Sequence, residues 1–154
     1  MQTNNLKNDM KLYHGSKNNF TSIKRSQAGK ADNIEVPENE LLDAIYLTPD
    51  YGFALACATR PEGVTEIDDN NKVITFENPE LFDPEEEVFV YELDIENIPK
   101  EKIIEVDDHQ YAVDIDELKV LNKFLHKAKE VQKYYELKNW QEKQKEVNIG
   151  LKIR

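Results

Sequence analysis

The chain has 154 residues and a mass of 18.0 kDa, which is the usual size of one domain. Hydrophobic residues make up 39% and charged residues 33%, a balance that supports one core and excludes collagen-like and membrane classes. With 20 Lys and Arg against 31 Asp and Glu, the net charge of −11 disfavours a general nucleic-acid binder. The lone Cys57 cannot form an internal disulfide, and no signal or spanning segment stands out, so we expect a cytoplasmic protein.

The first part of the chain predicts one short strand and a long loop. Residues 1–10 are polar and are expected to be a lead-in to a single domain over 11–154. Residues 11–15 read as a strand that glycine and serine end. Residues 22–39 are polar and have no helical or strand period, which predicts a long loop of the kind that often carries function.

The clearest local feature is a strand that leads directly into a helix. Residues 44–48 form an apolar run typical of a strand, and Pro49 and Asp50 open an alanine-rich helix over 51–58. Beyond this helix the middle of the chain is expected to be rich in β-structure, with strands at 72–76, 88–93, 102–106 and 109–113.

From Asp116 onward the pattern predicts a helix. Apolar residues recur there at spacings of three and four, which indicates one buried helical stripe. Asp116 and Glu117 suit the N-terminus of a helix. We therefore expect a C-terminal helix over about 116–147 that frays after Trp140. The stripe consists of Leu118, Leu121, Phe124, Leu125, Ala128, Val131 and Tyr135.

Three short motifs follow one another along the chain: Tyr-His-Gly-Ser at 13–16, Ile-Tyr-Leu-Thr at 45–48, and Gln-Tyr-Ala-Val at 110–113. In this order they resemble the ADP-ribosyltransferase superfamily. The closer resemblance is to its His-Tyr-Glu branch, which is poly(ADP-ribose) polymerase-like or diphtheria-toxin-like and includes small bacterial and phage members. The resemblance covers about 11–118 and implies an α+β fold with split mixed or antiparallel β-sheets around a central NAD cleft.

The resemblance implies roles for four residues, and the chemistry of the guanidinium group suggests a fifth. His14 would hydrogen-bond the ribose on the nicotinamide side of NAD, and the Gly15 backbone would hold the nicotinamide carboxamide, where the lack of a Cβ permits a close approach. Ser16 could add a hydroxyl contact, and Tyr46 would stack on the nicotinamide ring. Arg25, in the long loop, could bind the pyrophosphate because a guanidinium group holds phosphate oxygens bidentately.

At the third motif the chain departs from the branch, because Gln110 stands where the branch has its catalytic glutamate. Glutamate would supply negative charge as nicotinamide departs, whereas glutamine keeps a hydrogen bond and loses that charge. A second tyrosine on the helix is also missing, and Tyr51 or Phe53 could take its place. Strand alternation predicts Val106, Asp108, Gln110 and Ala112 on one face, and Tyr111, Val113 and Ile115 on the other.

The function implied by the resemblance is NAD-dependent mono-ADP-ribosyl transfer to a protein or small-molecule acceptor, with NAD as the donor substrate and no metal. Gln110 keeps open a second reading, a catalytically inactive module that binds NAD or a protein. An RNA 2′-phosphotransferase would share the fold, but the net charge and the lack of an Arg-His-Arg cluster argue against it. Neither a nucleic acid nor a membrane is expected as a partner.

Overall fold

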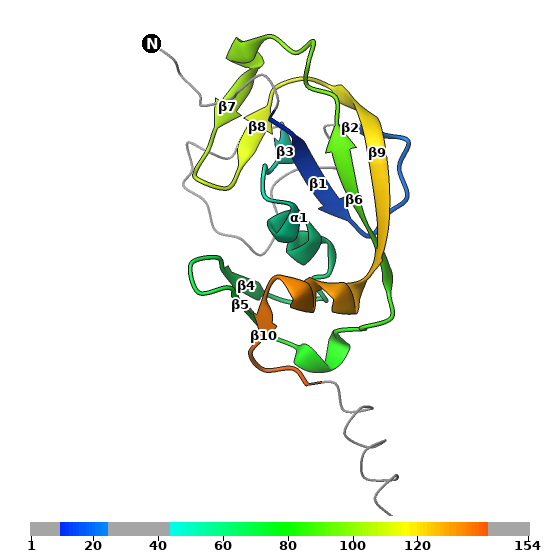
Figure 1. The fold of residues 1–154 in the computed structure, drawn as a ribbon, viewed down its shortest axis with the longest axis vertical. Coiled ribbons are helices and arrows are strands. Elements are labelled where there is room, and N and C mark those ends of the chain that lie inside the picture. The colour runs from blue at the N-terminus through cyan, green and yellow to red at the C-terminus, as the bar shows by residue number, and fades with distance from the viewer. Residues whose placement is uncertain (1–9, 25–43, 142–154) are drawn as a thin grey trace, which may run out of the picture.

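The computed structural model describes residues 10–24 and 44–141. This part of the chain is mostly β-structure, with one short α-helix and three small sheets, so an α+β class holds in broad terms (Figure 1). The strands are β1 Leu12–Ser16, β2 Ser22–Lys24, β3 Ile45–Leu47, β4 Thr65–Asp68, β5 Val73–Phe76, β6 Glu87–Leu93, β7 Ile103–Glu105, β8 Tyr111–Val113, β9 Glu117–Lys127 and β10 Glu136–Leu137. The helix is α1 Tyr51–Ala58, and 3₁₀ turns occur at η3 Pro79–Leu81, η4 Lys100–Lys102 and η5 Ala128–Lys133.

The three sheets differ in size and in the direction of their strands. The largest has the order β1-β6-β9-β2 and is antiparallel throughout. A second antiparallel sheet has the order β3-β8-β7. In the third, β10-β5-β4, the pair β10 and β5 is parallel. Figure 1 shows the first two sheets in the upper half, the third in the lower half, and α1 between them.

Helix α1 has the bounds predicted from the sequence, and its ends explain why. The Asp50 side chain accepts a hydrogen bond from the backbone N–H of Phe53 at 3.1 Å, which satisfies a donor that the first turn leaves free. At the other end the Thr59 hydroxyl donates to the carbonyl of Ala56 at 3.0 Å. Six of the eight helical residues are buried, and the small side chains of Ala54 and Ala58 let α1 lie close to β1.

Strand β6 divides two hydrophobic clusters, because its successive side chains point to opposite faces. Val88 and Val90 belong to the cluster that includes α1, β5 and η5. Tyr91 and Leu93 belong to the cluster formed with β1, β3, β7 and β8. Both clusters therefore depend on β6, which pairs with β1 on one side and β9 on the other.

The C-terminal helix predicted over about 116–147 is wrong for the part of the chain that the structure describes. Residues 117–127 form strand β9, and residues 142–147 lie outside the described ranges. The strand pairs with the whole of β6, and this pairing outweighs the local spacing of apolar residues. Of the predicted stripe, Leu118 is buried, whereas Leu121, Phe124 and Leu125 are 50%, 38% and 57% exposed. A single buried helical face would have covered all four.

The sequence also missed three short strands, of which β10 lies within the predicted C-terminal helix and pairs with β5. Strand β2 occupies the start of the predicted loop 22–39 and pairs with β9, and the rest of that loop from residue 25 lies outside the described residues. Strand β4 pairs with β5 across a turn in which Lys72 has a φ of 58°. The predicted strands at 11–15, 44–48, 72–76, 88–93, 102–106 and 109–113 are confirmed with small shifts of their ends.

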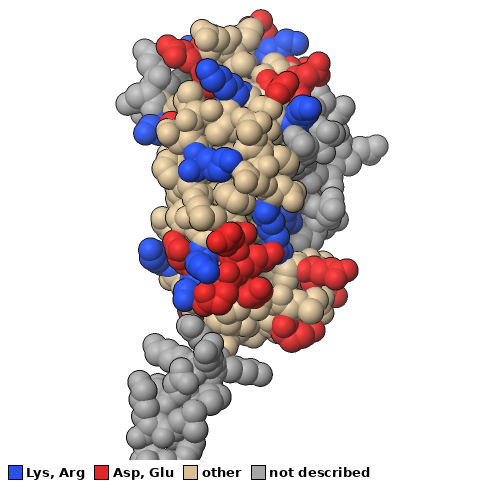
Figure 2. Space-filling model, turned by 90° about the vertical axis from the view of Figure 1, so that its right-hand side faces the viewer, with Lys and Arg blue, Asp and Glu red and all other residues tan. Residues whose placement is uncertain are grey.

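Charge is unevenly spread over the side of the molecule on which β9 lies. Figure 2 shows that the middle of this face is mostly uncharged, with isolated Lys or Arg side chains, and that acidic side chains gather below it. Among the described residues, no helix has the length and apolar character needed to cross a membrane.

Candidate functional site

The first two motifs meet where two sheets join. Strand β1 is an edge strand of one sheet and β3 is an edge strand of another. A pair of backbone hydrogen bonds connects the two sheets at this point. The N–H of Tyr13 donates to the carbonyl of Thr48 at 2.7 Å, and the N–H of Thr48 donates to the carbonyl of Tyr13 at 2.9 Å. This junction places His14 next to Tyr46, its partner in the predicted site.

His14 is oriented by a backbone carbonyl. Its Nδ1 lies 3.3 Å from the carbonyl oxygen of Tyr46, and since a carbonyl oxygen only accepts, Nδ1 carries the hydrogen. The pKa of His14 is lowered to about 4, mainly by burial and also by the nearby charge of Arg60, while the hydrogen bond to the Tyr46 carbonyl acts in the opposite direction. At neutral pH the imidazole is therefore uncharged, and Nε2 offers a lone pair to a hydroxyl donor.

Tyr46 is largely enclosed by protein. Its side chain is 6% exposed and belongs to a small cluster with Ala44, Ala112 and, at its edge, Val106. Its partner across the sheet is Ala112, so the two side chains lie on the same face. The packing gives Tyr46 a role in the core, and its predicted stacking on a nicotinamide ring stays a prediction.

Gln110 directly precedes β8. Residues 45, 46 and 47 pair with 113, 112 and 111, so the same register places Gln110 opposite Thr48. Alternation then puts Gln110 on the face that carries Tyr46 and Ala112. The third predicted position thus lies on the same side of this sheet as the second.

The predicted faces of the last strand are confirmed in one part and wrong in another. Tyr111 and Val113 are buried in one cluster, with Ile115 packed against it, while Ala112 packs elsewhere. Val106 packs beside Ala112 as predicted, but the predicted place of Asp108 on this face is wrong, because the chain turns between Val106 and Gln110. The carbonyl of Gln110 accepts from the N–H groups of Val106 at 2.9 Å and Asp107 at 3.3 Å. Asp108 is exposed in this turn.

The structure provides a packing reason for Gly15. A Cβ at this position would lie 1.8 Å from the carbonyl oxygen of Ala54 and 3.2 Å from the Cβ of Ala58. Glycine is therefore required because α1 crosses β1 at this point. Ser16, the next predicted contact, accepts a hydrogen bond from the N–H of Asn18 at 3.0 Å, which ties its hydroxyl to the following turn.

Arg60 is a basic residue near His14 that the sequence analysis missed. It follows α1, and its Nε donates to the carbonyl of Cys57 at 2.9 Å. Its charge contributes to the lowered pKa of His14. No local signal in the sequence identifies it, because its position near His14 depends on how α1 packs against β1. Arg25, the residue predicted to bind pyrophosphate, lies outside the described residues.

The aromatic residues offered as substitutes for a second stacking tyrosine have other contacts. Tyr51 packs edge-on against Tyr13 at 5.1 Å between ring centres, and its hydroxyl is 2.6 Å from Nε2 of His126. Phe53 is 8% exposed and stacks on the ring of His109 at 5.7 Å. Cys57 is no candidate nucleophile, because burial raises the pKa of its thiol to about 11.

A polar network lies near the start of α1. Asp69 accepts hydrogen bonds from Lys72 at 2.8 Å and from the Tyr135 hydroxyl at 2.6 Å, and its other oxygen is 3.3 Å from Nε2 of His109. Asp50, Asp69 and His109 each offer a metal-ligand atom within 4.8 Å of the others. The Lys72 ammonium, 3.8 Å from Asp50, already supplies positive charge to both carboxylates, so we describe this group as an ion-paired network.

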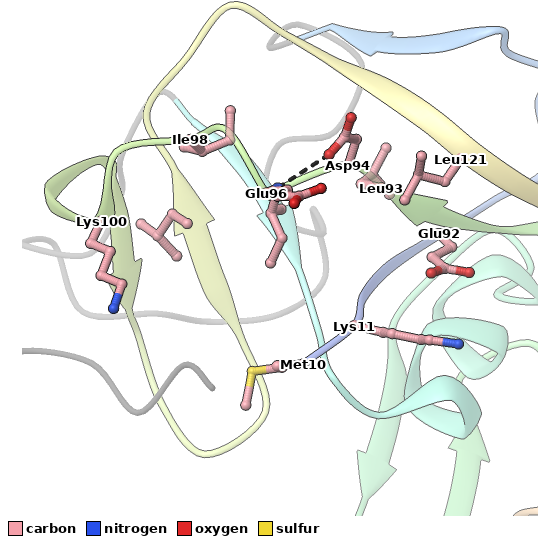
Figure 3. A pocket seen from close by; sticks show the side chains of 11 residues that line it. Met10, Lys11, Glu92, Leu93, Asp94, Glu96, Ile98, Lys100 and Leu121 are labelled. Atoms are coloured by element: carbon pink, nitrogen blue, oxygen red, sulfur yellow. Dashed lines mark hydrogen bonds between the residues drawn. The ribbon is translucent and has the colours of Figure 1, made fainter. Parts of the chain in front are cut away.

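A cavity of about 450 Å³ opens beside the start of β1 and the end of β6 (Figure 3). Glu92 is 8% exposed there and accepts a hydrogen bond from Asn122 at 2.9 Å. Carboxylates and lysines both line the cavity, so the lining favours no single charge of ligand. The lining residues are Met10, Lys11, Glu92, Leu93, Asp94, Ile95, Glu96, Ile98, Lys100, Ile103 and Leu121, and none belongs to the predicted site.

Comparisons of this chain with protein-family models, with curated proteins and with solved structures each find no match.

Proposed function

We propose that this protein is an NAD-dependent mono-ADP-ribosyltransferase that modifies a protein or small-molecule acceptor. The observation that supports this most is the contact between Nδ1 of His14 and the carbonyl of Tyr46, at 3.3 Å. Two residues matched only by short motifs, 32 positions apart in the chain, are neighbours in space. The strand register also brings Gln110 to the face of Tyr46. Residues of one site must lie close together in space, however far apart they are in the chain.

The proposed reaction breaks the bond between ribose C1′ and the nicotinamide nitrogen of NAD. The electron pair leaves with nicotinamide, which departs as a neutral molecule, and a nucleophile of the acceptor forms a bond to C1′ and releases its proton to solvent. Nε2 of the neutral His14 would accept a hydrogen bond from a ribose hydroxyl. Tyr46 would hold the nicotinamide ring, and the Arg60 guanidinium would attract the diphosphate.

Gln110 favours a second candidate, an NAD-binding module without transferase activity. Positive charge develops on the ribose as nicotinamide leaves, and a carboxylate would stabilise that charge in the transition state. The amide of Gln110 can hydrogen-bond a ribose hydroxyl but carries no charge. Slow turnover, or binding without turnover, is the expected consequence.

The test measures release of labelled nicotinamide from NAD, with a cell lysate as the source of acceptors. We expect His14→Ala to lower the rate about tenfold or more, because a hydrogen bond to the ribose is lost. His126→Ala is the matched control, since His126 is another half-buried histidine with side-chain hydrogen bonds, to Tyr51 and Glu130. It should leave the rate unchanged. Thermal unfolding of both variants shows whether the fold is retained.

Equal release by wild type and His14→Ala would contradict a role for this site. Release that occurs only in Gln110→Glu would favour the non-catalytic module and identify the natural protein as an inactive descendant of a transferase. If neither protein releases nicotinamide and calorimetry detects no NAD binding by wild type, both candidates are wrong.

A further inference from the structure

One edge of β9 is open over most of its length. On one side the strand pairs with β6, from Val120 opposite Leu93 to Lys127 opposite Glu87. On the other side only residues 117–119 pair, with β2. Within residues 10–24 and 44–141, no strand pairs with this side of β9 from residue 120 to residue 127. We call this stretch the open β9 edge. Unpaired edges of this kind can accept a strand from another chain.

The direction of the backbone groups follows from one hydrogen bond. The N–H of Ala128 donates to the carbonyl of Glu86 at 2.8 Å, so Ala128 and every second residue back to Asn122, beyond which the register shifts, point their backbone groups toward β6. Lys123 and Leu125, which lie between these residues, therefore point their N–H and C=O groups outward. The N–H of Lys127 also points away from β6, and it donates to Oε2 of Glu130 at 3.0 Å.

The side chains of the open β9 edge are apolar and basic. Leu125 is 57% exposed and Phe124 is 38% exposed. Strand β9 contains three lysines and one glutamate, although the whole chain has a net charge of −11. Lys127 is 3.6 Å from a carboxylate oxygen of Glu85. Lys123 is exposed, and no carboxylate of the described residues forms an ion pair with it. Its ammonium donates to Oδ1 of Asn19 and lies 5.8 Å from the centre of the Phe89 ring. Figure 2 shows the corresponding face as mostly uncharged with isolated basic groups.

A second copy of the chain fits this edge poorly. Two antiparallel β9 strands centred on Lys123 place this lysine opposite itself, and strands centred on Leu125 place Lys123 opposite Lys127. Strands centred on Phe124 place Lys123 opposite Leu125, so no negative charge faces this lysine. Glu117, the acidic residue of β9, already lies opposite Lys24 of β2 and accepts a hydrogen bond from Ser22. Like charges directly opposite one another destabilise a strand pair.

We propose that the open β9 edge binds an extended segment of another protein in which acidic and apolar residues alternate. The segment adds a strand to the β1-β6-β9-β2 sheet through the outward backbone groups of Lys123 and Leu125. Its acidic residues lie on the face of Lys123 and Lys127, and its apolar residues lie on the opposite face, where they cover Phe124. Main-chain hydrogen bonds supply affinity in this mode of recognition, and the side-chain pattern supplies specificity. The proposal is independent of the proposed transferase activity.

The test uses the full chain, labelled with ¹⁵N, and a synthetic peptide of about nine residues in which Glu and Val alternate. The control peptide has the same length and has Lys in place of Glu. We expect the acidic peptide to bind at least about tenfold more tightly and to protect the amides of Lys123 and Leu125 from hydrogen exchange. Failure of the acidic peptide to bind at millimolar concentration, or equal binding of both peptides, would overturn the proposal.

Two variants separate the charge from the backbone contribution. The double change Lys123→Glu and Lys127→Glu should reverse the preference between the peptides, whereas Lys100→Glu with Lys102→Glu, an equal charge change on the exposed η4, should not. Leu125→Pro removes an outward N–H that is not bonded to β6 and should abolish binding while the fold survives. Unchanged binding by Leu125→Pro, or self-association of wild type through β9 in sedimentation, would count against the proposal.

Discussion

The protonation state of His14 is decided by its surroundings. Burial lowers its pKa to about 4 from the ordinary 6.5, and the charge of Arg60 acts in the same direction. The hydrogen bond to the Tyr46 carbonyl opposes this shift and selects the tautomer with hydrogen on Nδ1. A neutral, oriented imidazole at physiological pH is the form that can accept a hydrogen bond from a ligand hydroxyl.

The lowered pKa of His14 should be visible in the pH dependence of stability. Between pH 6.5 and about 4 the unfolded chain binds a proton at this histidine and the folded chain does not, so acidification over this range favours unfolding. Urea unfolding at several pH values checks this. The stability of wild type relative to His14→Gln should be greatest above pH 6.5 and should decline toward pH 4. Curves that stay parallel over this range would show that His14 titrates normally.

Helix α1 and strand β9 form for different reasons, one local and one tertiary. The start of α1 is determined within four residues, by the contact of Asp50 with the N–H of Phe53. Strand β9 depends on β6, a segment about thirty residues earlier in the chain, as the register of Asn122 opposite Glu92 illustrates. A local signal therefore predicts the first element, and a distant partner determines the second.

Loss of the α1 cap should destabilise the protein by a measurable amount. We expect Asp50→Ala to lower the free energy of unfolding by about 1 kcal/mol, since the N–H of Phe53 loses its acceptor. Asp50→Asn keeps a good capping group and removes only the charge, which lies 3.8 Å from Lys72, so it should cost much less. Urea unfolding compares the two variants, and an equal loss in both would assign the effect to the charge.

Across the whole molecule, the Asp69 network links segments that are far apart in the chain. It joins the turn between β4 and β5, the turn between β7 and β8 through His109, and the residues before β10 through Tyr135. Burial raises the pKa of Asp69, but hydrogen bonds from Lys72 and Tyr135 and the charges of His109 and Lys72 outweigh it, so the pKa is lowered. The ionised carboxylate thus holds the turn next to Gln110 in place.

Asp69→Asn should reduce stability at neutral pH by about 1 to 3 kcal/mol, because it removes a charged acceptor of several hydrogen bonds. Since the folded pKa of Asp69 is below 3.8, this contribution is present above pH 3.8 and is lost as the pH falls through the folded value. The difference between wild type and variant should therefore shrink below pH 3.8 in urea unfolding. A difference that is constant with pH would show that the charge of Asp69 has no part in it.

The sequence alone named the residues of the candidate site and predicted part of the fold. The order of the motifs singled out His14, Tyr46 and Gln110, and the structure makes the first two neighbours. Arg60 was missed because no local pattern shows where a helix returns the chain. From the sequence, the glycine at position 15 was attributed to the close approach of a ligand. The structure instead shows the carbonyl of Ala54 in the space that a Cβ would occupy.

What the sequence by itself determined are features whose cause lies within a few residues. The Asp50 cap and the small residues that follow it specify α1, and apolar runs between turn residues specify the short strands. Only the tertiary structure decided that residues 117–127 are a strand, that His14 meets Tyr46, and that Asp69 joins three segments. The physical reason is that backbone pairing and burial depend on partners distant in the chain, which can override a local spacing of three and four.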